Sequence, residues 1–81
     1  MRTALNRPVR VFKHNRLPFK IIWSEREAFV TKIIDYWKDI GDWWQGEGEK
    51  DFFRLYLDNG TLCEIYYDYQ EDIWQLYKIY D

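Results

Sequence analysis

Hydrophobic residues recur along this chain in short runs, most of which alternate with polar residues, and turn-forming residues separate the runs. Such runs are typical of strands that bury one face of a sheet. They predict strands at residues 9–13, 19–23, 52–57, 61–67 and 73–80. The pattern therefore indicates a small β domain.

The clearest predicted feature is a β-hairpin around Asp58-Asn59-Gly60, because Asn-Gly favours a two-residue hairpin turn. With Asp58 opposite Thr61, alternation defines two faces of the hairpin. Trp74 and Leu76 of the last strand are expected on the Phe53 face, which we predict to be the core. This register places on one face Phe53, Leu55, Leu57, Leu62, Glu64 and Tyr66, and on the other Phe52, Arg54, Tyr56, Cys63, Ile65 and Tyr67.

Glu64 tests this register, because a carboxylate on an apolar face needs a charged or hydrogen-bonding partner. Arg54 and Lys78 are the candidate partners. If Glu64 has no partner on the Phe53 face, the register is wrong by one residue and the faces of one strand are exchanged.

The segment 24–40 fits two different structures. Ser24 and Glu27 form a helix capping box, and apolar residues follow at helical spacing until Gly41, which predicts a helix at about 25–40. The same segment is rich in β-branched and aromatic residues, and 24–27 can equally turn a hairpin between two long strands. The local pattern does not decide between them.

Taken together, the pattern predicts a flexible basic lead-in at residues 1–7 and a single small β domain at 8–81. If 24–40 forms strands, the fold is all-β, a single strongly curved antiparallel sheet or small barrel of about six strands. An α+β fold with a helix at about 25–40 is the alternative. The residues expected in the core are Trp23, Trp37, Phe53, Leu55, Tyr66, Trp74 and Leu76.

Aromatic residues make up 21% of the 81 residues, and they change the expectation for stability. A domain this short has a small core, but each buried ring contributes on the order of 150–250 Å² of buried surface. Cys63 is the only cysteine, so no internal disulfide is possible. With no apolar run of membrane-spanning length and no signal peptide, we expect a cytoplasmic protein.

Charge is unevenly distributed, although the net charge is only -2. The first twenty residues contain six Arg or Lys and no Asp or Glu. A basic segment on an acidic body can contact a polyanion such as nucleic acid, or it can pair with the carboxylates of its own domain.

Catalytic and metal sites have little support in this sequence. His14 is the only histidine and lies far from Cys63, and neither zinc-binding spacing nor a phosphate-binding glycine loop is present. The acids Glu47, Glu49 and Asp51 form a loop without the apolar pocket that separates the pKa values of catalytic carboxylates. We therefore expect no enzyme activity, no cofactor and no metal.

Several aromatic motifs occur at defined spacing along the chain. They are Trp23, Trp37, Trp43-Trp44-Gln45-Gly46-Glu47, Asp51-Phe52-Phe53-Arg54, Glu64-Ile65-Tyr66, Trp74-Gln75-Leu76 and Tyr80-Asp81. Over about residues 8–81 these motifs resemble a small bacterial domain family of unknown function, and the resemblance extends to the carboxy-terminal module of catalytically degenerate Y-family DNA polymerase homologues. It implies a hairpin rather than a helix within 19–37, and therefore an all-β fold, although Ser24-Glu25-Arg26-Glu27 replaces the basic, glycine-containing turn of the related sequences.

Two binding functions fit these features. The first is a protein-binding adaptor, accessory to DNA repair or translesion synthesis, because Trp, Tyr and Arg dominate interface hot spots. Trp43 and Trp44 are either a lid on the core or part of this contact. The alternative is direct binding of single-stranded nucleic acid by a basic arm and an aromatic face. The expected protein contacts are Trp43, Trp44, Arg54, Tyr56 and Tyr67, and the expected nucleic-acid contacts are Arg10, Lys13, Arg16 and Lys20.

Overall fold

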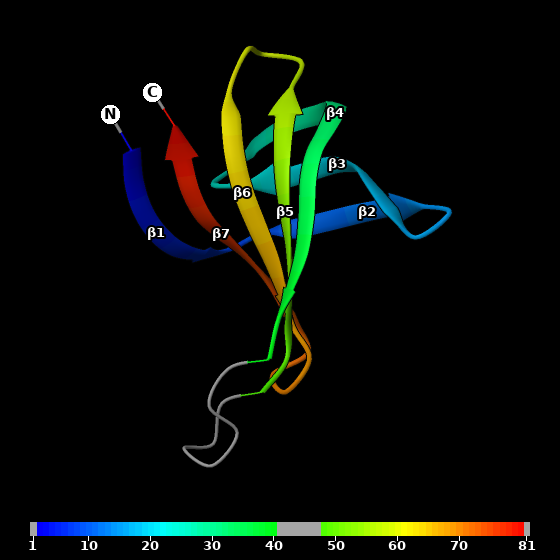
Figure 1. Ribbon diagram of the computed structural model, residues 1–81. Helices are drawn as coiled ribbons and strands as arrows, with labels where there is room; N and C mark the ends of the chain where they lie inside the picture. The colour runs from blue at the N-terminus through cyan, green and yellow to red at the C-terminus, as the bar shows by residue number, and fades with distance from the viewer. Residues whose placement is uncertain (1, 41–47, 81) are drawn as a thin grey trace.

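The computed structural model describes residues 2–40 and 48–80, and the regular elements in these two ranges are all β-strands. The strands form one antiparallel sheet in the order β1-β7-β6-β5-β4-β3-β2 (Figure 1). The all-β prediction is confirmed, and the helix at about 25–40 is wrong. The strands are β1 (Arg2–Pro8), β2 (Arg10–His14), β3 (Leu17–Trp23), β4 (Arg26–Asp39), β5 (Lys50–Leu57), β6 (Leu62–Asp68) and β7 (Ile73–Tyr80).

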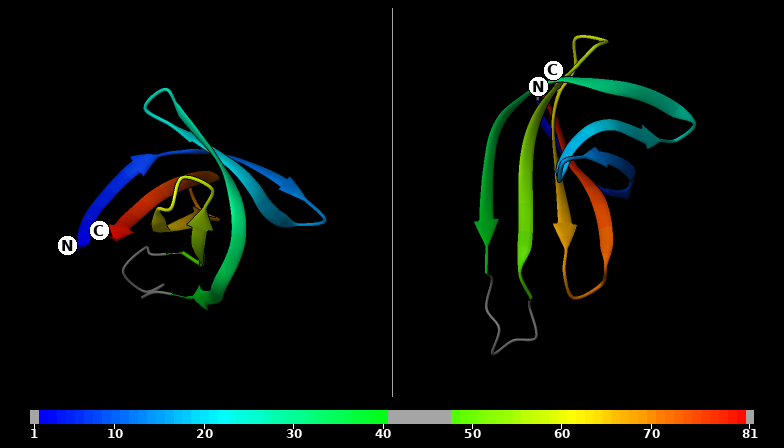
Figure 2. Two further views of the ribbon diagram at one scale, coloured as in Figure 1. Left: turned by 90° about the horizontal axis from the view of Figure 1, so that it is seen from above. Right: turned by 90° about the vertical axis from the view of Figure 1, so that its right-hand side faces the viewer.

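The sheet curls into a half-barrel because β4 is long and bent. Its first part, up to Phe29, pairs with β3, and from Val30 onward it pairs with β5. Two register irregularities, at Val30/Lys32 and Ile33/Asp35, interrupt the second pairing. Irregularities of this kind bend a strand and increase its twist. As a result, the β2–β3 hairpin runs across the strands β5, β6 and β7 instead of continuing their plane (Figures 1 and 2).

The two edges of the sheet are joined by a single residue. Strands β1 and β2 lie at opposite edges, yet only Val9 separates them in the sequence. Val9 is buried, and its N–H donates to the Trp74 carbonyl at 3.2 Å. Most of the lead-in expected at 1–7 belongs to β1, which pairs with β7. This strand raises the number from the predicted six to seven.

Ser24 and Glu25 form a two-residue turn between β3 and β4, where the sequence also allowed the start of a helix. Both residues have positive φ, 47° and 62°, and Trp23 pairs with Arg26 across the turn. Positive φ at both central positions is the type I′ geometry that matches the twist of a hairpin. The capping-box pattern at Ser24 and Glu27 is therefore not used as a helix start.

Replacement of Glu25 with glycine should stabilise the domain by about 0.5–1 kcal/mol, because only glycine adopts this left-handed conformation without a steric cost. Urea unfolding of the purified protein measures the change. Arg26→Gly is the matched control, since Arg26 is a strand residue outside the turn and should lose stability. Equal effects of the two substitutions would contradict the turn geometry.

The hairpin between β5 and β6 is present, but its predicted register is wrong by one residue. The loop contains three residues, Asp58, Asn59 and Gly60, with Gly60 at φ 85°. The Leu57 N–H donates to the Thr61 carbonyl at 2.8 Å, which closes the loop. Asp58 is also held from outside the hairpin, because its N–H donates to the Phe29 carbonyl at 2.9 Å.

The corrected register exchanges the two faces of β6. Phe53 pairs with Ile65, and Arg54 pairs with Glu64. Cys63 and Ile65 therefore face the core, whereas Leu62, Glu64 and Tyr66 lie on the outer face. Four of the predicted core residues, Trp23, Phe53, Leu55 and Leu76, are buried in the core, and Trp74 packs against it. Trp37 and Tyr66 lie instead at the outer face, where Trp37 stacks on Phe52 and the Tyr66 ring contacts Phe52 at a tilt.

Candidate functional site

Cross-strand rows on the inner face of the half-barrel change from apolar to polar toward one end of the sheet. One row contains Tyr36, Phe53, Ile65 and Leu76 from β4, β5, β6 and β7. The next row, toward Asp39 at the end of β4, contains Lys38, Asp51, Tyr67 and Trp74 from the same strands. The core therefore ends in a row that combines rings with charges.

An open groove lies over this polar end, between the sheet and the β2–β3 hairpin. Its volume is about 830 Å³, which is within the range of ligand-binding clefts. We call it the aromatic groove. The residues that line it are Lys13, Arg16, Leu17, Ile33, Tyr36, Asp51, Phe53, Tyr67, Tyr69, Asp72 and Trp74.

Five rings form a continuous arc along the aromatic groove. Their order is Tyr36, Phe53, Trp74, Tyr67 and Tyr69, and successive ring centroids are 4.9, 5.8, 5.2 and 4.9 Å apart. The interplanar angles lie between 41° and 77°, so the rings meet at tilted or edge-on angles. We call these five residues the ring arc.

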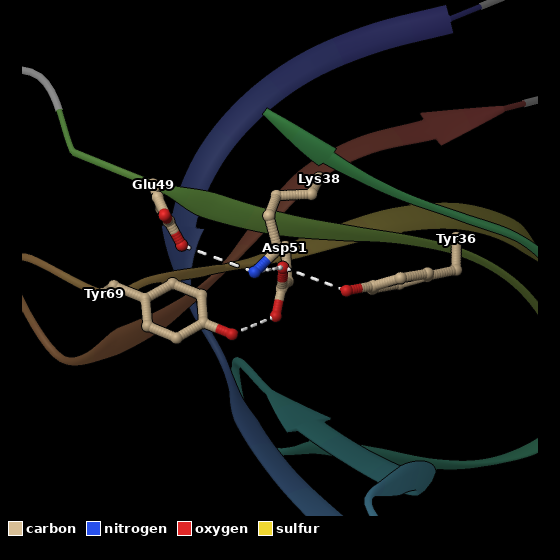
Figure 3. A network of polar contacts seen from close by, with 5 residues as sticks. All are labelled: Tyr36, Lys38, Glu49, Asp51 and Tyr69. Atoms are coloured by element: carbon tan, nitrogen blue, oxygen red, sulfur yellow. Dashed lines mark hydrogen bonds and ion pairs between the residues drawn. The ribbon is translucent and has the colours of Figure 1, made fainter. Parts of the chain in front are cut away.

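A single carboxylate connects the two ends of the ring arc. Asp51 accepts a hydrogen bond from the Tyr36 hydroxyl at 3.1 Å and another from the Tyr69 hydroxyl. Lys38 Nζ lies 3.7 Å from Asp51 Oδ1 and 3.3 Å from Glu49 Oε2, and 5.1 Å from the centroid of the Tyr69 ring (Figure 3). The charge of Asp51 is therefore compensated within the domain.

A second carboxylate, Asp72, lies in the turn before β7 and accepts a hydrogen bond from the Tyr67 hydroxyl. Its φ of 56° is left-handed, and its N–H donates to the Asp68 carbonyl at 2.8 Å. Within the described part of the chain, no ion pair joins Asp72 to a basic side chain.

Hydrogen bonds to these carboxylates, and burial in the case of Tyr36, raise the pKa values of three groove tyrosines. The pKa of Tyr69 is raised, mainly by its hydrogen bond to Asp51, and the pKa of Tyr67 is raised, mainly by its hydrogen bond to Asp72. The pKa of Tyr36 is also raised, by burial and then by Asp51. The three hydroxyls therefore act as neutral donors at neutral pH.

Two basic residues of the β2–β3 hairpin line the opposite side of the groove. Lys13 Nζ lies 5.7 Å from the centroid of the Trp74 ring, within the range of a cation–π contact. Arg16 occupies the second position of the hairpin turn, with φ 68° after Asn15 at φ 52°. A hairpin turn of this geometry favours glycine where this chain has Arg16.

The structure brings together only some of the site residues expected from the sequence. Tyr67, Lys13 and Arg16 line the aromatic groove. Arg10 and Lys20 lie instead beside the Phe12 ring, at 5.8 and 5.2 Å.

Arg54 and Tyr56 belong to the outer face of β5, away from the groove. Arg54 Nε and Nη2 donate to Glu64 Oε2 at 3.0 and 2.9 Å, and the Tyr80 hydroxyl donates to the same oxygen. The bond to Glu64 raises the pKa of Arg54. Because Glu64 is 2% exposed, this cluster holds a buried charge in place. The expected contacts Trp43 and Trp44 lie outside the described residues.

Sequence reasoning expected Phe53 and Trp74 only as core residues, and among the polar groove residues it missed Tyr36, Asp51, Tyr69 and Asp72 as site residues. Asp51 appeared in an acidic loop and in a family motif but not as a site residue, although it is the pairing partner of Tyr67 across β5 and β6. The correct hairpin register would have placed these two side chains on one face. Tyr69 and Asp72 belong to a turn, where the alternation of side chains along a strand does not apply and cannot predict which face a residue lies on.

The thiol considered for catalysis lies apart from the groove. Cys63 is buried, and burial raises the pKa of its thiol to about 12. Within residues 2–40 and 48–80, no cluster of three His, Cys, Asp or Glu side chains is arranged to hold a metal ion. No helix long and apolar enough to cross a membrane occurs in these ranges.

Comparison with known proteins gives one result. A family model described as "Domain of unknown function (DUF6504)" matches residues 3–81. No curated protein and no solved structure gives a significant match to the chain.

Proposed function

We propose that this chain, which belongs to the family described as a domain of unknown function (DUF6504), is a binding module that holds a segment of a partner protein in its aromatic groove. The observation that carries the proposal is the ring arc at the open end of the half-barrel. Tyr36 and Tyr69, at the two ends of the arc, are 49% and 48% exposed. Tyrosine and tryptophan rings provide a large contact area with little loss of conformational freedom.

The proposed activity is binding without catalysis, in the cytoplasm. Accessory action in DNA repair or translesion synthesis is the finer proposal, and it rests on the resemblance to the module of Y-family polymerase homologues. The groove supports binding independently of that resemblance, because its hydroxyls and carboxylates are already engaged with one another. A preorganised polar network costs less to order when a ligand enters.

Single-stranded nucleic acid is the second candidate ligand, favoured by the position of Lys13 and Arg16 beside the rings. Bases can stack on aromatic side chains while basic groups contact phosphates. Asp51 and Asp72 oppose this function, because they place two carboxylates in the same groove. We therefore rank the protein segment first.

Tyr69→Ala should abolish capture of the partner, because it removes one end of the ring arc. The measurement is quantitative mass spectrometry of proteins retained by the immobilised domain from cells that express it. Tyr56→Ala is the matched control, since Tyr56 is 45% exposed on the outer face of β5. A protein retained by the wild type and by Tyr56→Ala, but lost with Tyr69→Ala, is the expected result.

Two results would contradict the proposal. One is a set of retained proteins that does not change with Tyr69→Ala. The other is steep, salt-dependent binding of a short oligo-deoxythymidine that Tyr69→Ala removes, which would assign the groove to single-stranded nucleic acid.

A further inference from the structure

The aromatic groove already holds ammonium groups of its own chain against its rings. Lys38 Nζ lies 5.1 Å from the Tyr69 centroid, and Lys13 Nζ lies 5.7 Å from the Trp74 centroid. A ring face attracts a cation through the quadrupole of the ring, and a nearby carboxylate strengthens the site. The groove is therefore built from groups that suit a cationic side chain.

The two carboxylates of the groove differ in how their charges are compensated. Asp51 lies 3.7 Å from Lys38 Nζ, whereas no ion pair joins Asp72 to a basic group among the described residues. Asp72 is attached through the Tyr67 hydroxyl to the Tyr67–Trp74 part of the ring arc. A ligand cation at this end of the groove would meet the Tyr67 ring, the Trp74 ring that Lys13 also contacts, and a carboxylate that has no ion pair among the described residues.

We propose that the aromatic groove recognises an arginine side chain of the partner segment, with its guanidinium against Trp74 and Tyr67 and paired with Asp72. This inference rests on the proposed function and names the ligand chemistry of the same groove. An acidic residue of the same segment faces Lys13 and Arg16 on the opposite side. The partner segment is thus of mixed charge, which matches the two charged sides of the groove.

Arginine fits this site better than lysine for geometric reasons. The guanidinium is planar, stacks on aromatic faces and offers a fork of donors to a carboxylate. It is also less strongly hydrated than an ammonium group, so it loses less on entering a groove lined by rings. A strongly basic segment is disfavoured because Lys13 and Arg16 repel it, and a polyanion is disfavoured by Asp51 and Asp72.

The test uses the short peptide acetyl-Arg-Gly-Glu-amide as the probe. It is titrated into the domain at millimolar concentration and followed by the aromatic proton–carbon NMR signals of Trp74 and Tyr67. The reference probe carries citrulline, the neutral isostere of arginine. We expect saturable shifts at these two rings with the arginine peptide, and at least tenfold weaker binding of the citrulline peptide.

Asp72→Asn should weaken binding of the arginine peptide about tenfold. Glu71→Gln is the matched control, because it removes the same charge from the neighbouring exposed position of the same turn. Its affinity should remain within twofold of the wild type. The spectra of both variants outside the groove report whether the fold is unchanged.

Equal binding of the arginine and citrulline peptides would overturn the inference, and so would shifts confined to other rings or the absence of shifts. Tighter binding of oligo-deoxythymidine by Asp72→Asn, without any arginine-peptide binding by the wild type, would also overturn it and favour phosphate recognition. These outcomes remain distinct from failure of the proposed function. A partner whose capture depends on Tyr69 can still exist when the arginine peptide does not bind.

Discussion

Replacing Arg54 with methionine is expected to lower the free energy of unfolding by about 3 kcal/mol, because it leaves the Glu64 carboxylate buried without its cation. Glu64 is 2% exposed, and Arg54 donates two hydrogen bonds to its Oε2 atom. Methionine retains an apolar stem that can pack between the Trp37 and Tyr80 rings, which lie 5.5 and 5.8 Å from the guanidinium. The loss therefore reports the charge rather than the packing.

Urea unfolding of the single and double variants measures this effect. Arg54→Met with Glu64→Leu should recover a large part of the loss, because removing both charges removes the uncompensated carboxylate. A loss below about 1 kcal/mol in Arg54→Met would show that the ion pair contributes no more than an exposed surface pair. It would also return Arg54 to the list of candidate partner contacts.

Local residue chemistry was sufficient to predict a small β domain, the β5–β6 and β6–β7 hairpins and the expectation that Trp74 and Leu76 lie on the Phe53 face, whereas the all-β class also rested on the family resemblance. These features depend on alternation and turn residues within a few positions of one another. The segment 24–40 could not be decided locally. Its strand form depends on pairing with β3 and β5 on either side, which is a long-range effect.

The register error in the β5–β6 hairpin has a similar origin. A glycine with positive φ follows asparagine in both a two-residue and a three-residue loop, so Asn59-Gly60 does not determine the loop length. The three-residue loop also holds Asp58 against Phe29 of β4 through two hydrogen bonds. The Asp58 N–H donates to the Phe29 carbonyl at 2.9 Å, and the Phe29 N–H donates to Asp58 Oδ1 at 3.3 Å. No pattern within the hairpin reveals this tertiary contact.

The candidate site was predictable only in part, because the groove combines segments from six strands and two turns. Lys13, Arg16 and Tyr67 were chosen for their charge or ring, and the fold places them around one groove. Arg54 was chosen for the same reason but neutralises Glu64. A sequence does not show whether a basic residue compensates a buried carboxylate or is available to a ligand. Only the pairing register of the strands distinguishes the two roles.

Stability is expected to fall at alkaline pH, starting near pH 9, because the folded domain holds Cys63 as a neutral thiol. Burial, together with the nearby charge of Glu64, raises the pKa of this thiol from 9.0 to about 12. Between these two values the unfolded chain loses the proton and the folded chain keeps it, so stability decreases as pH rises. At pH 10.5 the loss from this thiol is roughly 2 kcal/mol.

Urea unfolding at pH 8 and pH 10.5 measures this loss, and Cys63→Ala isolates the share of the thiol. The alanine variant loses the same packing at both pH values. Its free energy of unfolding should therefore depend less on pH than that of the wild type. The pH dependence that remains in the variant comes from tyrosines such as Tyr66, whose pKa is raised by burial. The same burial predicts that the native thiol does not react with a disulfide reagent at pH 8 until urea unfolds the chain. Equal slopes in the two proteins would mean that the unfolded chain also protects the thiol, because linkage compares the folded state with the unfolded state.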